Sequence, residues 1–124
     1  MWGNLFAVAA GGAIGAVMRY GVGNVLAARA GFPLATLAVN VTGCLLFGFL
    51  ALWMSERLPM AVELRAFLLV GVLGAFTTFS AFSGETLLLL QQGDATRALV
   101  NVFANVALCL LAAAAGFWLA RQAT

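Results

Sequence analysis

Charge is scarce in this sequence, and two of the ordinary polar residues are missing altogether. Only 8% of the 124 residues are charged, there is no histidine, and all six basic residues are arginines. Soluble domains carry roughly a quarter charged residues, so a water-soluble fold is nearly excluded. The lack of histidine removes the usual zinc, haem and histidine-based catalytic sites. The arginines are dispersed and form no basic stripe, so a nucleic acid is not expected as a partner.

Cysteine is equally rare, and both cysteines lie inside apolar runs. Cys44 and Cys109 have no CxxC spacing, so we interpret them as small buried hydrophobic residues. The sequence shows no pairing of a nucleophile with a general base, so an enzymatic site is not expected. The N-terminus lacks the basic start and the small-residue cleavage site of a secretory signal, and we expect the first helix to be retained.

The sequence contains four long runs without a charged residue. They cover residues 1–18, 30–55, 66–84 and 98–120 and contain 18, 26, 19 and 23 residues. About 20 mostly apolar residues cross a bilayer as a helix. The sequence therefore predicts an all-α membrane protein, with a single four-helix transmembrane domain over residues 1–124. The helices are expected at about 5–27, 34–54, 62–91 and 98–120, and the third is expected to break near 74–78.

The arginines give almost none of the bias that orients most membrane proteins. Cytoplasmic loops normally carry the excess of basic residues. Here three arginines are expected on one side and two on the other, namely Arg57, Arg65 and Arg121 against Arg29 and Arg97. The near balance favours insertion in both orientations, with two opposed copies completing one pathway as inverted repeats do in transporters. The alternative is that the bias is weak only because the charges are few.

The most unusual segment runs from Gly74 to Ser83 and puts four hydroxyls and three phenyl rings inside an expected span. Unpaired backbone groups are costly in lipid, so a helix break survives only inside protein or beside a water-filled cavity. Gly74 with Thr77 favours such a break, whose carbonyls can coordinate a cation, over close helix packing.

Phe79 and Phe82 lie three residues apart and share one helical face. The edge of a phenyl ring is positive, so two rings presented edge-on can hold a small anion. Ordinary core or lipid-facing side chains are the alternative, and the neighbouring hydroxyls, including Ser80, favour the anion. Glu85 ends the uncharged run and is expected at a vestibule or an interface.

The other spans carry polar residues with two open interpretations. Thr36 and Asn40 share a face of the second helix, and Asn101, Asn105 and Cys109 recur every four residues on the fourth. Each set either lines a pathway or joins helices by hydrogen bonds. Arg19 is expected at a vestibule, where it attracts anions or fixes structure. No carboxylate is expected at the membrane centre, which argues against proton coupling and leaves a passive path.

Three segments together resemble the signature of the fluoride channels called Fluc or CrcB. They are Gly12-Ala-Ile-Gly-Ala-Val-Met-Arg-Tyr20, Thr36-Leu-Ala-Val-Asn40 and the stretch from Gly74 to Phe82. The resemblance covers essentially the whole chain. It implies a multi-pass protein of the bacterial inner membrane that forms a dual-topology, antiparallel homodimer with two pores. Such a channel exports cytoplasmic fluoride passively down its electrochemical gradient and protects the cell against fluoride.

The resemblance also implies roles for single residues. Asn40, Phe79 and Phe82 match pore positions, with Thr36 and Ser80 close to the path. Gly74 and Thr77 match positions whose backbone carbonyls, from both subunits, hold a structural Na⁺. Vestibule, interface or polar-track positions are matched by Arg19, Glu85, Asn101 and Asn105. The chain departs from the family pattern at Ala75-Phe76, at Ala81 and along the fourth helix, where hydroxyls are expected.

Two functions from other classes compete with this interpretation. One is a small proton-coupled exporter of the multidrug type, whose flux would depend on a pH gradient. The other is a membrane assembly protein that transports nothing by itself.

Overall fold

The computed structural model describes residues 1–26 and 31–123, and helices dominate them. α1 (Trp2–Leu26) and α2 (Leu34–Arg57) come first. The consecutive segments α3 (Val62–Arg65), η1 (Ala66–Leu73), α4 (Gly74–Phe76) and α5 (Phe79–Gln91) follow, and α6 (Ala95–Ala123) comes last. The expected end of the first helix at residue 27, and Arg29 beyond it, lie outside the described residues.

Within residues 1–26 and 31–123, four helical stretches are long and apolar enough to cross a membrane. They contain 25, 24, 30 and 29 residues, the third being the run from α3 to α5. The expectation of an all-helical protein with four such spans is confirmed. α2 and α6 reach past the uncharged runs and include Arg57, Arg97 and Arg121. A helix can continue beyond the hydrocarbon because long arginine side chains reach the interface.

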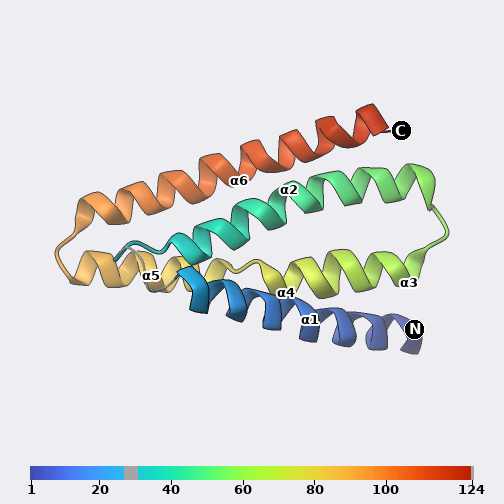
Figure 1. Ribbon diagram of the computed structural model, residues 1–124, viewed down its shortest axis with the longest axis horizontal. Coiled ribbons are helices and arrows are strands. Elements are labelled where there is room, and N and C mark those ends of the chain that lie inside the picture. Colours follow the sequence, from blue (N-terminus) through green and yellow to red (C-terminus); the bar gives the residue numbers. More distant parts are fainter. Residues whose placement is uncertain (27–30, 124) are drawn as a thin grey trace.

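The spans form two closely packed pairs. α2 packs mainly against α6, and α1 packs against η1 and α4, while α5 packs on α6. Figure 1 shows α2 and α6 side by side and running in the same direction, whereas α1 and the run from α3 to α5 run the opposite way. The order along the chain therefore alternates direction at each span, as a four-pass membrane protein requires.

Glycines allow these pairs to approach closely. A Cβ atom at Gly15 would overlap the carbonyl oxygen of Val72 across the α1–η1 contact, and one at Gly116 would overlap that of Leu45 across the α2–α6 contact. Small residues at helix crossings are the usual way to bring backbones together in lipid, where van der Waals packing holds helices.

The surface of the chain is apolar and part of its interior is polar. Large hydrophobic side chains are exposed along the outside of the helices, among them Phe6, Val17, Phe103 and Leu110. Among the residues that the structure describes, the buried polar ones are Thr36, Asn101 and Asn105. This distribution suits a protein whose outer faces meet lipid and whose hydrogen bonds are made inside.

Candidate functional site

A two-residue bend divides the third span. α4 ends at Phe76, α5 begins at Phe79, and Thr77 and Thr78 between them have extended backbone angles (φ −82°, ψ 156° and φ −152°, ψ 117°). Thr77 Oγ1 donates to the Leu73 carbonyl at 2.9 Å. Thr78 Oγ1 accepts the Ala81 N–H at 3.1 Å and so caps the first turn of α5. A helix N-terminus therefore begins within the third span. The π-helical segment η1, a form that recurs at functional sites, leads into this bend.

Asn40 of α2 holds the bend in place. Its Nδ2 donates to the Thr78 carbonyl at 3.1 Å, and its Oδ1 accepts the Thr78 N–H at 2.8 Å. The second Nδ2 hydrogen is donated to Asn105 Oδ1 of α6 at 3.0 Å. Both amide hydrogens of Asn40 are thus taken up within the chain, so an anion reaches this donor only by replacing the Thr78 carbonyl or Asn105 Oδ1.

The bend also leaves two carbonyl oxygens without their helical donors. In a continuous helix the Thr78 N–H would reach the Gly74 carbonyl and the Ala81 N–H would reach the Thr77 carbonyl. Here the first is donated to Asn40 and the second to Thr78 Oγ1. Gly74 and Thr77 line the same cavity of about 200 Å³, together with Gly43, Cys44, Phe47, Leu69, Leu73 and Ala113.

Arg19 is tied to the same bend from α1. Its Nε donates to the Ala75 carbonyl at 3.0 Å, one residue after Gly74. Arg19 is half-buried, and it donates to a backbone oxygen that lies close to the bend. Arg19 therefore supports the local backbone at the bend.

The asparagines of α6 continue the network that starts at the bend. Asn105 Nδ2 donates to both the backbone oxygen and Oδ1 of Asn101 at 3.0 Å. Asn101 Nδ2 donates to Thr86 Oγ1 at 2.9 Å, and Thr86 Oγ1 donates to the Phe82 carbonyl at 2.7 Å. Asn101 is fully buried and Asn105 is 5% exposed. One chain of hydrogen bonds thus joins α2, α6 and α5 around the start of α5.

The two phenylalanines meet at this N-terminus with different exposure. Their ring centroids are 5.3 Å apart and the rings are inclined by 56°. Phe82 is 8% exposed, whereas Phe79 is 78% exposed. Both line a groove of about 360 Å³, whose other lining residues are Asn40, Cys44, Thr77, Thr78, Asn105, Val106, Cys109 and Leu110. We call this hollow the phenylalanine groove.

The phenylalanine groove brings together several of the site residues that were predicted from the sequence, while the other predicted site residues lie outside it. Asn40, Thr77, Phe79, Phe82 and Asn105 line it, whereas Gly74 lies in the adjacent cavity of about 200 Å³. Ser80 is exposed and shares a hydrogen bond of 3.2 Å with Thr78 Oγ1.

Thr36 and Glu85 form a separate pair. Thr36 Oγ1 donates to Glu85 Oε1 at 2.7 Å. The other carboxylate oxygen of Glu85 is buried, without a hydrogen-bond partner in the described part of the chain. Glu85 lines a cavity of about 290 Å³ near the connection that leads into α2, in company with Phe32, Pro33 and Gln92.

Sequence reasoning missed Thr78 and Thr86. Thr78 could have been predicted, because threonine is a preferred N-cap residue. Its hydroxyl oxygen accepts the backbone N–H three residues later, in the first turn of the helix. Thr86 could not, since its partner Asn101 comes from another span.

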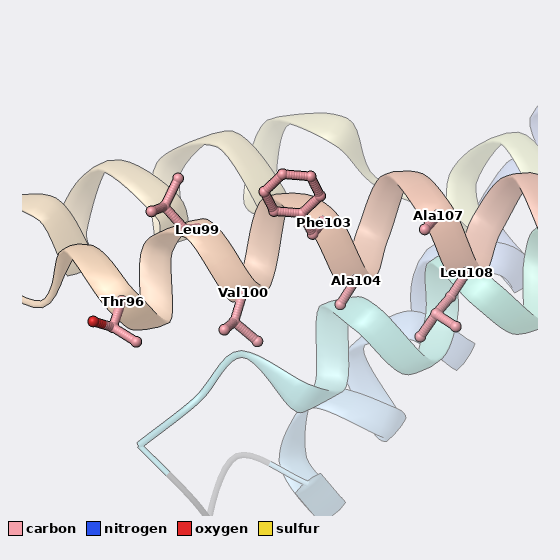
Figure 2. A pocket seen from close by; sticks show the side chains of 7 residues that line it. All are labelled: Thr96, Leu99, Val100, Phe103, Ala104, Ala107 and Leu108. Carbon is pink, nitrogen blue, oxygen red and sulfur yellow. The ribbon is translucent and has the colours of Figure 1, made fainter.

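Another hollow lies away from these residues. It measures about 510 Å³ and is lined by α6 alone, through Thr96, Leu99, Val100, Phe103, Ala104, Ala107 and Leu108. Figure 2 shows these side chains projecting from one helix, with a single hydroxyl oxygen among them. An open, apolar helix face of this kind is what lipid contact requires.

Comparison with known proteins decides which family this architecture belongs to. A model of the family described as "CrcB-like protein, Camphor Resistance (CrcB)" matches residues 6–117. The chain belongs to the CrcB-like family. Its curated relatives come from bacteria, and the described part of the chain has four helices long and apolar enough to cross a membrane, so this CrcB-like chain is a multi-pass bacterial membrane protein.

Relatives that carry the name "Fluoride-specific ion channel FluC" include proteins of three bacteria. The protein of Methylococcus capsulatus is 50% identical over 121 residues, which are 96% of this CrcB-like chain. Those of Rhizobium meliloti and Shewanella amazonensis are 47% identical over 120 residues and 50% identical over 110 residues, or 95% and 86% of this chain. The chain spans about half (53%) of the Methylococcus capsulatus protein, but 96% and 87% of the other two.

Proposed function

We propose that this protein is a fluoride channel that exports cytoplasmic fluoride passively and so protects a bacterial cell from fluoride toxicity. The relatives named as fluoride-specific channels support this function. The structural observation that carries it is the double hydrogen bond between Asn40 and Thr78. This bond holds the bend that starts α5 beside the phenylalanine groove, with Phe79 and Phe82 in its first turn.

The groove offers an anion partial positive charge without a fixed cation. The first N–H groups of a helix have no intrahelical acceptor and attract negative charge. Phe79 and Phe82 add ring edges, which are also positive. A site of this kind binds fluoride strongly enough to admit it and weakly enough to release it, as conduction requires.

Transport through this path is passive and involves no enzymatic step. The residues that line the phenylalanine groove include no aspartate or glutamate to carry a proton. Glu85 lies in a different cavity, hydrogen-bonded to Thr36. Fluoride efflux from proteoliposomes with a permeant counterion tests the proposal. Efflux should proceed at equal pH on both sides, and a strict requirement for a pH gradient would instead favour a proton-coupled exporter.

The working unit is an antiparallel homodimer with two pores. Phe79 lines the groove yet is 78% exposed in the single chain, and this supports a second copy that closes the groove over it. The balanced arginines allow that copy to insert the other way up. A Ser55→Cys variant with Cys44 and Cys109 replaced by serine tests this arrangement in intact cells. An impermeant maleimide should label one population from outside and leave a second one unlabelled, whereas uniform labelling would oppose dual topology.

A structural Na⁺ belongs at the bend, held by the backbone carbonyls of Gly74 and Thr77 from both copies. Oxygen ligands suit a hard cation, and these two oxygens have lost their helical donors. The bound ion would supply positive charge that keeps these carbonyls together. Replacing Na⁺ by a large organic cation should lower the thermal stability of the dimer. Because the ligands are backbone atoms, Thr77→Ser should keep this Na⁺ dependence, and its loss there would contradict the carbonyl account.

A further inference from the structure

α2 and α6 pack in a fixed parallel register. Asn40 lies opposite Asn105, to which it donates a hydrogen bond of 3.0 Å. Two turns further along, a Cβ atom at Gly48 would overlap the carbonyl oxygen of Ala113. Both contacts join residues separated by the same interval of sequence, so the two helices keep one alignment over this stretch.

Cys44 and Cys109 lie between these two contacts along α2 and α6. Each lies four residues after the asparagine of its own helix, and they are the only two cysteines in the chain. The shared register therefore places them opposite each other, and both side chains line the same groove. Neither is bonded to another cysteine.

The two thiols face the proposed ion path. Both line the phenylalanine groove together with Phe79 and Phe82. Cys44 also lines the cavity that contains Gly74 and Thr77. A group bound between the thiols would therefore lie beside the rings and next to the bend.

Two facing thiols without further ligands suit a narrow class of metal ion. In the described part of the chain no three histidine, cysteine or acidic residues gather as a metal site. Zinc, which takes four ligands, is poorly served by such a pair. Thiolates select soft ions, and Hg²⁺ is a soft ion that binds two thiolates in a line.

Charge balance further favours a soft divalent ion. In Hg²⁺ + 2 RSH → RS–Hg–SR + 2 H⁺, two S–H bonds break, two Hg–S bonds form and the complex is neutral. A monovalent soft ion between the same thiolates would leave a net negative charge. Such a charge is costly to hold in an apolar groove, so the divalent ion is the better occupant.

We propose that Cys44 and Cys109 together form a binding site for a two-coordinate soft divalent cation of the Hg²⁺ class, and that its occupation obstructs the phenylalanine groove. The binding site follows from the register of α2 and α6. The obstruction rests on the proposed channel function as well.

Stoichiometry tests the binding site without any flux measurement. The purified protein is titrated with HgCl₂, and bound mercury is measured alongside the thiols that still react with maleimide. Each bound mercury should remove both thiols of a chain, and Zn²⁺ should protect neither. One mercury for each thiol lost would overturn the bridged site.

Single substitutions provide the matched control for bridging. Cys44→Ser and Cys109→Ser each leave one thiol, so a small monothiol competitor should strip their mercury while the original protein retains it. Cys44→Ala and Cys109→Ala repeat the comparison without a hydroxyl, with thermal unfolding as the check on folding. Equal retention in the single variants and the original protein would contradict the proposal.

Flux tests the obstruction. Fluoride efflux is expressed as a fraction of each protein's own mercury-free rate. Hg²⁺ should abolish efflux through the original protein, a dithiol should restore it, and the variant with both cysteines replaced by serine should not respond. Bridged mercury with undiminished efflux would overturn the obstruction. If no protein passes fluoride before mercury is added, the channel function fails and the obstruction fails with it, while the stoichiometry still decides the binding site.

Discussion

The side-chain amide of Asn40 forms two hydrogen bonds with the backbone of Thr78, accepting the Thr78 N–H at 2.8 Å and donating to the Thr78 carbonyl at 3.1 Å. Side-chain amides can pair with one residue's backbone in this way because they carry a donor and an acceptor side by side. The amide thereby replaces helical hydrogen bonds that the extended backbone of Thr77 and Thr78 gives up. A bend inside a membrane span is tolerated because these backbone groups are satisfied within the protein.

Removing the Asn40 amide should therefore damage stability and transport together. Asn40→Ala loses three hydrogen bonds. Bonds between membrane helices average about 0.6 kcal/mol, so we expect a loss of about 2 kcal/mol. Fluoride efflux should fall as well, because the start of α5 is no longer fixed. Unfolding in detergent and efflux from proteoliposomes measure the two effects.

Thr42 provides a matched control on the same helix. It is exposed and does not line the phenylalanine groove. Thr42→Ala should leave stability and efflux near their original values. A stable, fully conducting Asn40→Ala variant would contradict the role given to this amide.

Phe79 and Phe82 should separate conduction from folding. Phe79 is 78% exposed in the chain, so Phe79→Ile should leave the stability of a single chain almost unchanged and still slow efflux. Phe82 is 8% exposed, and Phe82→Ile should lower both. Contacts of aromatic rings contribute about 0.5–1.5 kcal/mol, which corresponds to an efflux about 2- to 10-fold slower.

Phe103 is the matched control for Phe79. It is 71% exposed and lies on the outer face of α6, as Figure 2 shows. Phe103→Ile should conduct as the original protein does. Wild-type efflux in both the Phe79→Ile and the Phe82→Ile variants would refute the ring-edge role.

The register of α2 and α6 should depend on Gly116. A Cβ atom there would overlap the Leu45 carbonyl and lie 2.7 Å from the Phe49 nitrogen, and backbone atoms cannot give way as side chains do. Gly116→Ala should cost about 1–3 kcal/mol in the free energy of unfolding. Because the helices must separate, it should also disturb the Asn40–Asn105 bond and reduce efflux.

Gly21→Ala is the comparison for Gly116→Ala. A Cβ atom at Gly21 would meet nothing within 4 Å, and alanine favours a helix by about 1 kcal/mol. This variant should be as stable as the original or slightly more so. Equal stability of the two alanine variants would argue against the close packing of α2 on α6.

The cap at Thr78 should contribute separately from the Asn40 bonds. Thr78→Ala removes the hydroxyl that accepts the Ala81 N–H at 3.1 Å, and loss of such a cap costs about 1 kcal/mol. Thr78→Ser keeps the hydroxyl and should restore most of the stability. Thermal unfolding distinguishes the two, and indistinguishable melting of both variants would show that the cap contributes little.

The sequence predicts the four spans because charge is costly in lipid, and the spacing of ten charged residues is visible in the chain. It also points to Asn40, Phe79 and Phe82, because an amide and a hydroxyl-flanked pair of rings are unusual in a membrane helix. It does not predict that Asn40 binds Thr78 or that Asn101 binds Thr86. Those partners depend on how each helix is rotated against its neighbours, which no local pattern specifies. The sequence predicts Cys44 as a buried hydrophobic residue, whereas the rotation of α2 against its neighbours places it in the lining of the groove.

The central claim is that this groove passes fluoride and not chloride. Its most direct test loads proteoliposomes with both fluoride and chloride, supplies a permeant cation to carry the balancing charge, and records the efflux of each anion from the same vesicles. The account predicts rapid loss of fluoride, with chloride leaving no faster than from protein-free vesicles. Comparable efflux of both anions, or no fluoride efflux above the protein-free rate, would contradict it.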